Sequence, residues 1–174
     1  MDQQLFLKDL AVLLIDMQDG FILGDPVKLS IIPSQISVLR FSKENNIPVI
    51  IFNYEKYGET TEALNEEIKK MGTKNLYFFI KKRNDAFSVL GFDSILKEKG
   101  VTKLFIMGIN AGFCIYSTAK TAIEKGYKII TSADVIAGYT SEFRTTECPG
   151  RSWYEENGIF KKDHRQIIEE VIGP

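Results

Sequence analysis

Five short apolar runs, separated by helical patterns, place the strongest constraint on how this chain can fold. The runs span residues 10–15, 48–52, 76–80, 104–107 and 127–131. Helical patterns lie between them, at residues 33–41, 59–71, 92–99 and 114–125. A continuous apolar run is typical of a strand buried on both faces, and parallel strands need crossovers to connect them. The alternation predicts a three-layer α/β/α fold, Rossmann-like, with a mainly parallel sheet of five to six strands.

The C-terminal part of the chain carries a weaker pattern. Helical and strand periodicity both fade over residues 139–158. Ile159 and Phe160 fit a short edge strand, and residues 166–172 fit a closing helix. No repeat, low-complexity tract or linker divides the 174 residues, which suffice for one buried core. We therefore expect a single domain that spans residues 1–174.

The charge balance limits the classes of partner. The chain has 22 Lys and Arg residues against 23 Asp and Glu residues, a formal net charge of -1. This balance gives no electrostatic reason to expect nucleic acid or an anionic membrane as a partner. No segment approaches the roughly 18 apolar residues of a membrane span, and the first residues lack the basic and apolar regions of a secretory leader. We expect a cytoplasmic protein that binds a small molecule.

Cysteine and histidine are scarce. Cys114 and Cys148 lie far apart in different contexts, which favours reduced thiols over a disulfide framework. His164 is the single histidine of the sequence, which excludes metal sites that need several histidines. Any pairing of cysteine with histidine would depend on that residue.

A strand-to-helix turn carries one of the two cysteines. The fourth apolar run ends at Gly108, and a helical pattern opens at Cys114 after the glycine at position 112. Unpaired N–H groups at a helix N-terminus favour a thiolate, which makes such a cysteine a nucleophile. A small buried cysteine with no chemical role is the alternative reading of this stretch.

Three reactive side chains fall at the C-terminal ends of predicted strands, where ligands bind in open α/β sheets. Asp16 follows the first strand and precedes a predicted loop at residues 17–21, Lys81 follows the third strand, and Cys114 follows the fourth. Taken singly, Asp16 could be a turn residue and Lys81 part of a solvated basic patch. Together they supply a base, a cation that favours the thiolate, and a nucleophile.

Three blocks around these residues resemble a known family. Residues 14–21, 81–87 and 108–114 are similar, in order, to the signature blocks of the isochorismatase-like cysteine hydrolases. The resemblance implies a hydrolase that cleaves small amides or carbamoyl compounds through a covalent thioester. It implies Cys114 as the nucleophile, Asp16 as the general acid and base, and Lys81 as the residue that stabilises the thiolate.

The same resemblance implies a particular backbone geometry before the cysteine. It places a cis peptide bond between Ile109 and Asn110 and an oxyanion hole at the backbone N–H groups of Asn110 and Cys114. Donors of this kind typically contribute about 10²–10³ in rate. The glycines at 108 and 112 permit the tight turn that such a hole needs.

The chain departs from the family in the loop after the second strand. Nicotinamidases of this superfamily carry a metal site there, made of an aspartate and histidines. Residues 53–57 contain no histidine, so we expect no catalytic metal, no cofactor and no nicotinamidase activity. Glu55 either lines the pocket or is a solvated loop carboxylate. Four aromatic residues are candidates for the pocket wall, with burial in the core as their alternative: Phe21, Tyr54, Phe87 and Tyr116.

Two other functions stay open. In one, Asp16 alone acts as the acid in vinyl-ether hydrolysis and Cys114 is secondary. In the other, the domain is a non-catalytic binding module or oligomeric scaffold, although such a role has no need of the three reactive side chains. The family commonly forms homo-oligomers, which implies a dimer or tetramer with residues 139–158 as a candidate contact or lid.

Overall fold

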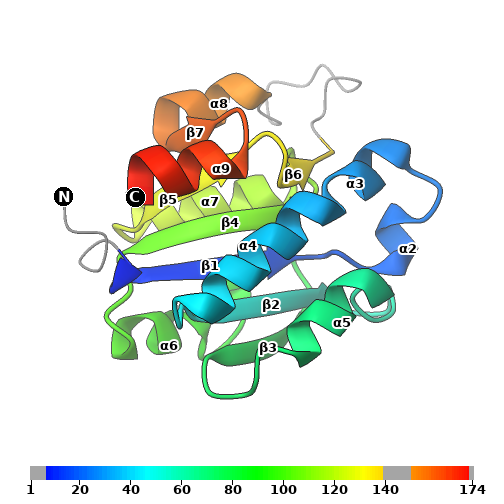
Figure 1. The fold of residues 1–174 in the computed structure, drawn as a ribbon, viewed down its shortest axis with the longest axis horizontal. Coiled ribbons are helices and arrows are strands. Elements are labelled where there is room, and N and C mark those ends of the chain that lie inside the picture. Colours follow the sequence, from blue (N-terminus) through cyan, green and yellow to red (C-terminus); the bar gives the residue numbers. More distant parts are fainter. Residues whose placement is uncertain (1–6, 139–149, 173–174) are drawn as a thin grey trace.

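The computed structural model describes residues 7–138 and 150–172, in which a seven-stranded parallel sheet forms the middle layer (Figure 1). The strand order is β3-β2-β1-β4-β5-β7, with β6 paired to β4. The strands are β1 (Leu10–Ile15), β2 (Val49–Tyr54), β3 (Leu76–Lys81), β4 (Lys103–Ile109), β5 (Lys128–Ser132), β6 (Ile136–Ala137) and β7 (Ile159–Lys161). The predicted α/β fold with a mainly parallel sheet is confirmed. The five apolar runs form β1 to β5, and the two short strands β6 and β7 join the sheet as well.

Helices cover both faces of the sheet. In Figure 1, α4 crosses in front of the central strands and α7 lies behind them. The helices are α2 (Asp19–Ile22), α3 (Pro26–Ser30), α4 (Ile32–Glu44), α5 (Glu62–Lys69), η1 (Ala86–Ser88), α6 (Phe92–Glu98), α7 (Cys114–Glu124), α8 (Arg151–Asn157), α9 (His164–Gln166) and η2 (Ile167–Ile172). Among the described residues, no helix is long and apolar enough to cross a membrane.

The two central strands form the middle of the core. Every residue of β1 is buried, and β4 is buried from its second residue onward, because helices cover these strands on both faces. The edge strand β3 differs: Phe78 and Ile80 are each more than half exposed. A central strand therefore reads as a continuous apolar run, whereas the apolar run of β3 did not indicate that one face would be open.

A glycine lets the two central strands approach at their C-terminal ends. Gly108 lies opposite Ile15 in the β1–β4 register and has a φ of 133°. A Cβ at Gly108 would clash with the Ile15 carbonyl oxygen. Any side chain here would push β4 away from β1, so the glycine keeps Asp16 beside the turn that leads to Cys114.

Short helices replace two segments that were predicted to be irregular. The predicted loop at residues 17–21 contains the start of α2, and α8 lies within residues 139–158, where the sequence shows only weak periodicity. Helices of this length depend on tertiary contacts, which periodicity does not report. In α8 the Tyr154 hydroxyl donates to the Ala111 carbonyl, and the Trp153 ring packs edge-on against Tyr116 at 4.9 Å. Of the candidate contact or lid at residues 139–158, residues 139–149 lie outside the described residues.

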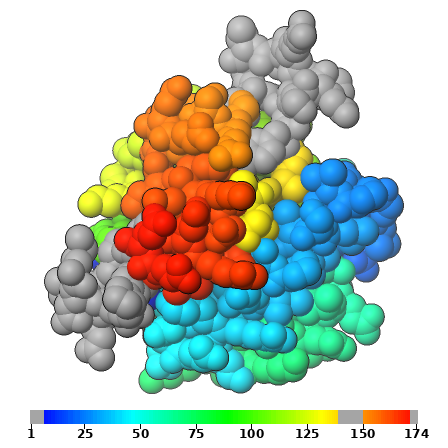
Figure 2. Space-filling model, turned by 45° about the horizontal axis from the view of Figure 1, so that its top comes forward, coloured from blue at the N-terminus to red at the C-terminus, as the bar shows by residue number. Residues whose placement is uncertain are grey.

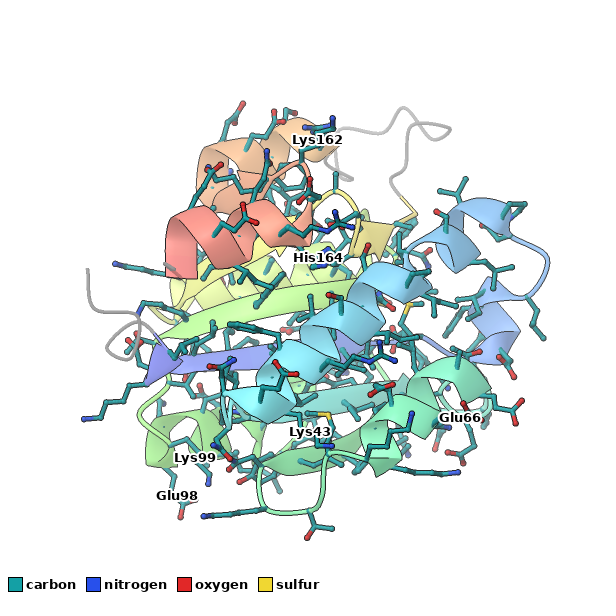
Figure 3. All side chains as sticks on the ribbon, viewed as in Figure 1. Lys43, Glu66, Glu98, Lys99, Lys162 and His164 are labelled. Carbon is teal, nitrogen blue, oxygen red and sulfur yellow. The ribbon has the colours of Figure 1, made fainter. Side chains whose placement is uncertain are left out.

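His164 fixes the C-terminal helices to the sheet. Its backbone N–H and its ring Nδ1 lie 2.9 and 2.7 Å from the two carboxylate oxygens of Asp134, which follows β5. Figure 3 shows His164 on the same face as α4, and Figure 2 shows the C-terminal segment packed beside α4. The single histidine is thus a structural residue that pairs with Asp134 and not with Cys114.

Candidate active site

Asp16, Lys81 and Cys114 converge at one edge of the sheet. Asp16 directly follows β1 in a left-handed conformation, Lys81 ends β3, and Cys114 begins α7. The exposed fractions of the three residues are 2%, 1% and 6%. Lys81 Nζ lies 2.7 Å from Asp16 Oδ2. Since β2 separates β3 from β1, the lysine has to reach across about 10 Å, which its four-carbon stem allows.

The Asp16 carboxylate has spare hydrogen-bonding capacity. Neither of its oxygens accepts a hydrogen bond of good geometry from a described residue, although Oδ2 lies 2.7 Å from Lys81 Nζ. The thiol of Cys114 interacts with this carboxylate and also lies 3.6 Å from Asn84 Oδ1. Asn84 was not singled out from the sequence, although it lies within the block at residues 81–87. A buried carboxylate with spare hydrogen-bonding capacity beside a thiol is suited to receive its proton.

Burial sets the protonation of the resting site. It raises the pKa of the Cys114 thiol to about 12, and the negative charge of Asp16 adds to the rise while Lys81 opposes it. Burial also raises the pKa of Asp16 above its usual value, an effect that the Lys81 ammonium counters only in part. The thiol is therefore protonated at rest. This differs from the expected thiolate, because desolvation outweighs the helix N-terminus and the lysine.

We expect alkylation of Cys114 by iodoacetamide to be slow at neutral pH and to accelerate through about pH 10. The thiolate fraction rises about tenfold per pH unit below the thiol pKa, and this pKa lies near 12. The rate is measured by mass spectrometry in a Cys148→Ser background, so that only one thiol reacts. A rate that levels off near neutral pH would show a preformed thiolate and contradict the raised pKa.

The turn before Cys114 presents backbone donors. Among the described residues, the N–H groups of Asn110 and Cys114 donate to no other group, whereas those of Phe113 and Ile115 both donate to the Asn110 carbonyl. The Ala111 N–H donates to Ala137 in β6 at 2.8 Å, which anchors the turn to the sheet. The Ile109–Asn110 peptide is cis, as the resemblance implies. The two unpaired N–H groups make this turn a candidate for binding an oxyanion.

Among the predicted pocket residues, Tyr54 contacts one of the three reactive side chains. Lys81 Nζ lies 4.3 Å from the centre of the Tyr54 ring. Phe21 contacts that ring edge-on at 6.2 Å and stacks on Tyr57 at 4.0 Å. These residues form an aromatic cluster beside the lysine.

The other two aromatic candidates make packing contacts. Phe87 packs against Phe92 at 4.7 Å and Tyr127 at 5.7 Å. Tyr116 packs against Trp153 of α8. These packing contacts favour the alternative in which both rings belong to the core and not to the pocket wall. The neighbouring Asp85 is structural as well, because its carboxylate accepts from the Phe87 N–H and from Thr121 at 2.8 Å each.

The polar side chains of the loop after β2 contact other protein groups. Glu55 is partly exposed and pairs with Lys82 at 3.3 Å, and Asn53 Oδ1 accepts from Thr60 at 2.9 Å. No group of three potential ligands, counting His, Cys, Asp and Glu, occurs in the parts of the chain that the structure describes. The contact with Lys82 favours the loop-carboxylate reading of Glu55.

Sequence reasoning missed the residue that holds this loop. Gln18 is buried, and its side-chain amide donates to the carbonyls of Tyr54 at 3.0 Å and Gly58 at 2.6 Å. Its oxygen accepts from the Tyr54 N–H at 2.6 Å. Gln18 lies two residues after Asp16, within the block at residues 14–21, so the block's similarity was the available signal. The side chain ties the loop after β2 to the loop after β1.

Comparisons with known proteins bear on the family and the fold. The family model described as the isochorismatase domain matches residues 10–149. The isochorismatase family protein YaaI of Bacillus subtilis is 29% identical over 152 residues, which cover 77% of this chain and 83% of YaaI. A protein of Arabidopsis thaliana named a probable inactive nicotinamidase is 28% identical over 167 residues, which cover 79% of this chain and 85% of that protein. The solved nicotinamidase of Staphylococcus aureus superposes with a TM-score of 0.79 at 20% identity, over 88% of this chain and 99% of that one.

Proposed function

The chain belongs to the isochorismatase family of hydrolases, and from this premise we propose that it cleaves a C–N bond of a small amide or carbamoyl compound through a thioester on Cys114. One observation carries the proposal: a buried Asp16–Lys81 ion pair lies beside a buried thiol, next to a turn with two unpaired N–H groups. A buried ion pair is costly to desolvate, and strongly shifted titratable groups concentrate at functional sites.

In the first half of the reaction, Asp16 takes the thiol proton as the sulfur attacks the carbonyl carbon. A C–S bond forms, and the carbonyl oxygen becomes negative within reach of the Asn110 and Cys114 N–H groups. Asp16 then passes the proton to the nitrogen of the leaving group, and the C–N bond breaks. The raised pKa of Asp16 suits it to both steps, because it makes the carboxylate a stronger base than a solvated one.

In the second half, water attacks the thioester. Asp16 takes a proton from the water, the C–S bond breaks, and the sulfur recovers a proton from Asp16. The Lys81 ammonium keeps the carboxylate oriented and partly offsets the rise of its pKa, so that Asp16 can lose its proton between the steps.

Two alternatives are weaker. Vinyl-ether hydrolysis needs only an acid, so it leaves the contact between the Cys114 thiol and Asp16 without a use. A non-catalytic role gains support from the relative named a probable inactive nicotinamidase. However, this chain keeps all three reactive side chains in one buried cluster.

The proposal is tested by trapping the acyl intermediate. Small primary amides, ureas and carbamoyl amino acids are screened for ammonia release, and the reaction of any substrate found is quenched in acid within one turnover. We expect intact-mass spectrometry to show an adduct of the acyl mass on Cys114 and none on Cys114→Ala. Turnover of isochorismate that survives in Cys114→Ala but not in Asp16→Asn would instead establish vinyl-ether hydrolysis.

A further inference from the structure

The Lys81 ammonium has more hydrogen-bonding capacity than its oxygen partners use. An ammonium group carries three N–H donors. Asp16 Oδ2 lies 2.7 Å from Lys81 Nζ, and the Arg83 carbonyl accepts from it at 3.2 Å. The lysine side chain has no exposed surface, so bulk water does not reach it. Its other near neighbours are the Cys114 thiol and the Tyr54 ring, whose centre lies 4.3 Å from the nitrogen.

Strand register brings the ring to this position. Tyr54 ends β2 and Lys81 ends β3, and the two residues are direct partners in the parallel pairing of these strands. Side chains of such partners leave the sheet on the same face. An aromatic face attracts a cation within about 6 Å of the ring centre, and most strongly where water is excluded.

The surroundings hold the ring in place. The Tyr54 hydroxyl donates to the Lys82 carbonyl at 2.9 Å, and Gln18 binds the Tyr54 backbone on both its N–H and its carbonyl. Phe21 and Tyr57 contact the ring edge-on at 6.2 and 5.7 Å. The ring is thus anchored at its backbone, its hydroxyl and its edges, which limits its movement away from the lysine.

We propose that Tyr54 is a positioning residue that acts through Lys81, as a side-chain partner of the ammonium whose charge distribution stays constant through the reaction. The inference rests on the proposed function. Whenever Asp16 holds the proton taken from the thiol or from water, its carboxyl group is neutral. The ammonium is then buried beside a neutral acid. The ring takes no part in the proton transfers, so it attracts the ammonium and keeps it in place until Asp16 ionises again.

The proposed role depends on the electrons of the aromatic ring and not on its shape. Graded substitutions at position 54 separate the two contributions. Tyr54→Phe keeps the ring and is expected to retain kcat within about threefold. Tyr54→Leu removes the ring and is expected to lower kcat by about 10- to 30-fold, the size of a desolvated cation–aromatic contact. Phenylalanine analogues with one, two and three ring fluorines at position 54 keep the shape and weaken cation binding stepwise. We expect log kcat to fall in step with fluorination.

Tyr77→Leu is the matched control, because the Tyr77 ring also lies beside a lysine, 5.8 Å from Lys99 Nζ, but Tyr77 is near the opposite end of β3 from Lys81. It is expected to leave kcat within about threefold of the wild type. A fluorinated series with constant kcat, or a Tyr54→Leu variant that changes KM alone, would overturn the proposal and make Tyr54 a pocket wall. Thermal melts identify any variant that fails to fold, and the fluorinated series remains informative in that case.

A second readout needs no substrate. At a fixed alkaline pH, iodoacetamide alkylation of Cys114 reports how well the lysine supports the thiolate, so the rate should fall along the same fluorinated series. Alkylation that follows fluorination, together with turnover that survives in Cys114→Ala, would keep the role of Tyr54 and reject the proposed function. Alkylation that ignores fluorination would reject the role of Tyr54, whatever the substrate.

Discussion

Replacing Cys114 with alanine is expected to lower kcat by at least about 10⁴-fold, because without the sulfur no thioester forms and the remaining groups give only residual rate enhancement. The folded structure should persist. Cys114 is a small side chain at the start of α7, so its truncation to alanine leaves little space unfilled. Ammonia release by the purified variant measures the loss, and circular dichroism checks the fold.

A serine variant sharpens this test. Cys114→Ser keeps a group of similar size that can donate a hydrogen bond, but its hydroxyl gives up a proton less readily than a thiol. We expect its kcat to stay close to that of Cys114→Ala. Wild-type rates in either variant would show that the sulfur forms no bond to the substrate, and would transfer the chemistry to Asp16.

The positions of the reactive residues could be predicted because parallel strands share one C-terminal edge. Once β1, β3 and β4 were identified from their apolar runs, the residues that follow them had to lie at the same C-terminal edge of the sheet. These residues are Asp16, Lys81 and Cys114. The ion pair follows from the length of the lysine and the burial of its partner.

Features that depend on contacts distant in sequence escaped prediction. The resting protonation of Cys114 is set by desolvation, which appears only when helices and loops close over the site. The contact of Tyr54 with Lys81 depends on the pairing of β2 with β3, and the role of Gln18 depends on how two loops meet. The homo-oligomer that the resemblance implies stays a prediction.

Replacing Lys81 with methionine is expected to destabilise the protein by about 3–5 kcal/mol at pH 8, as other broken buried ion pairs do. The Asp16 carboxylate would then lie buried without a cation. Methionine fills a similar volume, so lost packing contributes little. Urea denaturation of the variant and the wild type measures the difference in the free energy of unfolding.

The dependence on pH identifies the cause. The pKa of Asp16 in the folded protein is already above its ordinary value of 3.8, and loss of the ammonium raises it further. A carboxyl with a raised pKa binds its proton more tightly when folded, so its contribution to stability is largest below the ordinary pKa and is lost as the pH rises through the folded pKa. The deficit of Lys81→Met should therefore shrink between about pH 8 and pH 5. A deficit that is constant with pH would indicate lost packing.

The double variant Asp16→Asn/Lys81→Met completes the cycle. It removes both charges while keeping similar shapes, and replacing both partners of a buried pair is often neutral or stabilising. We expect it to regain at least half of the stability lost in Lys81→Met and to lose its dependence on pH, yet to have no measurable turnover. If the double variant were as unstable as Lys81→Met, the unpaired Asp16 carboxylate could not be the cause of the lost stability. Recovered stability without activity would show that the ion pair is retained for proton transfer at Cys114 and not for folding.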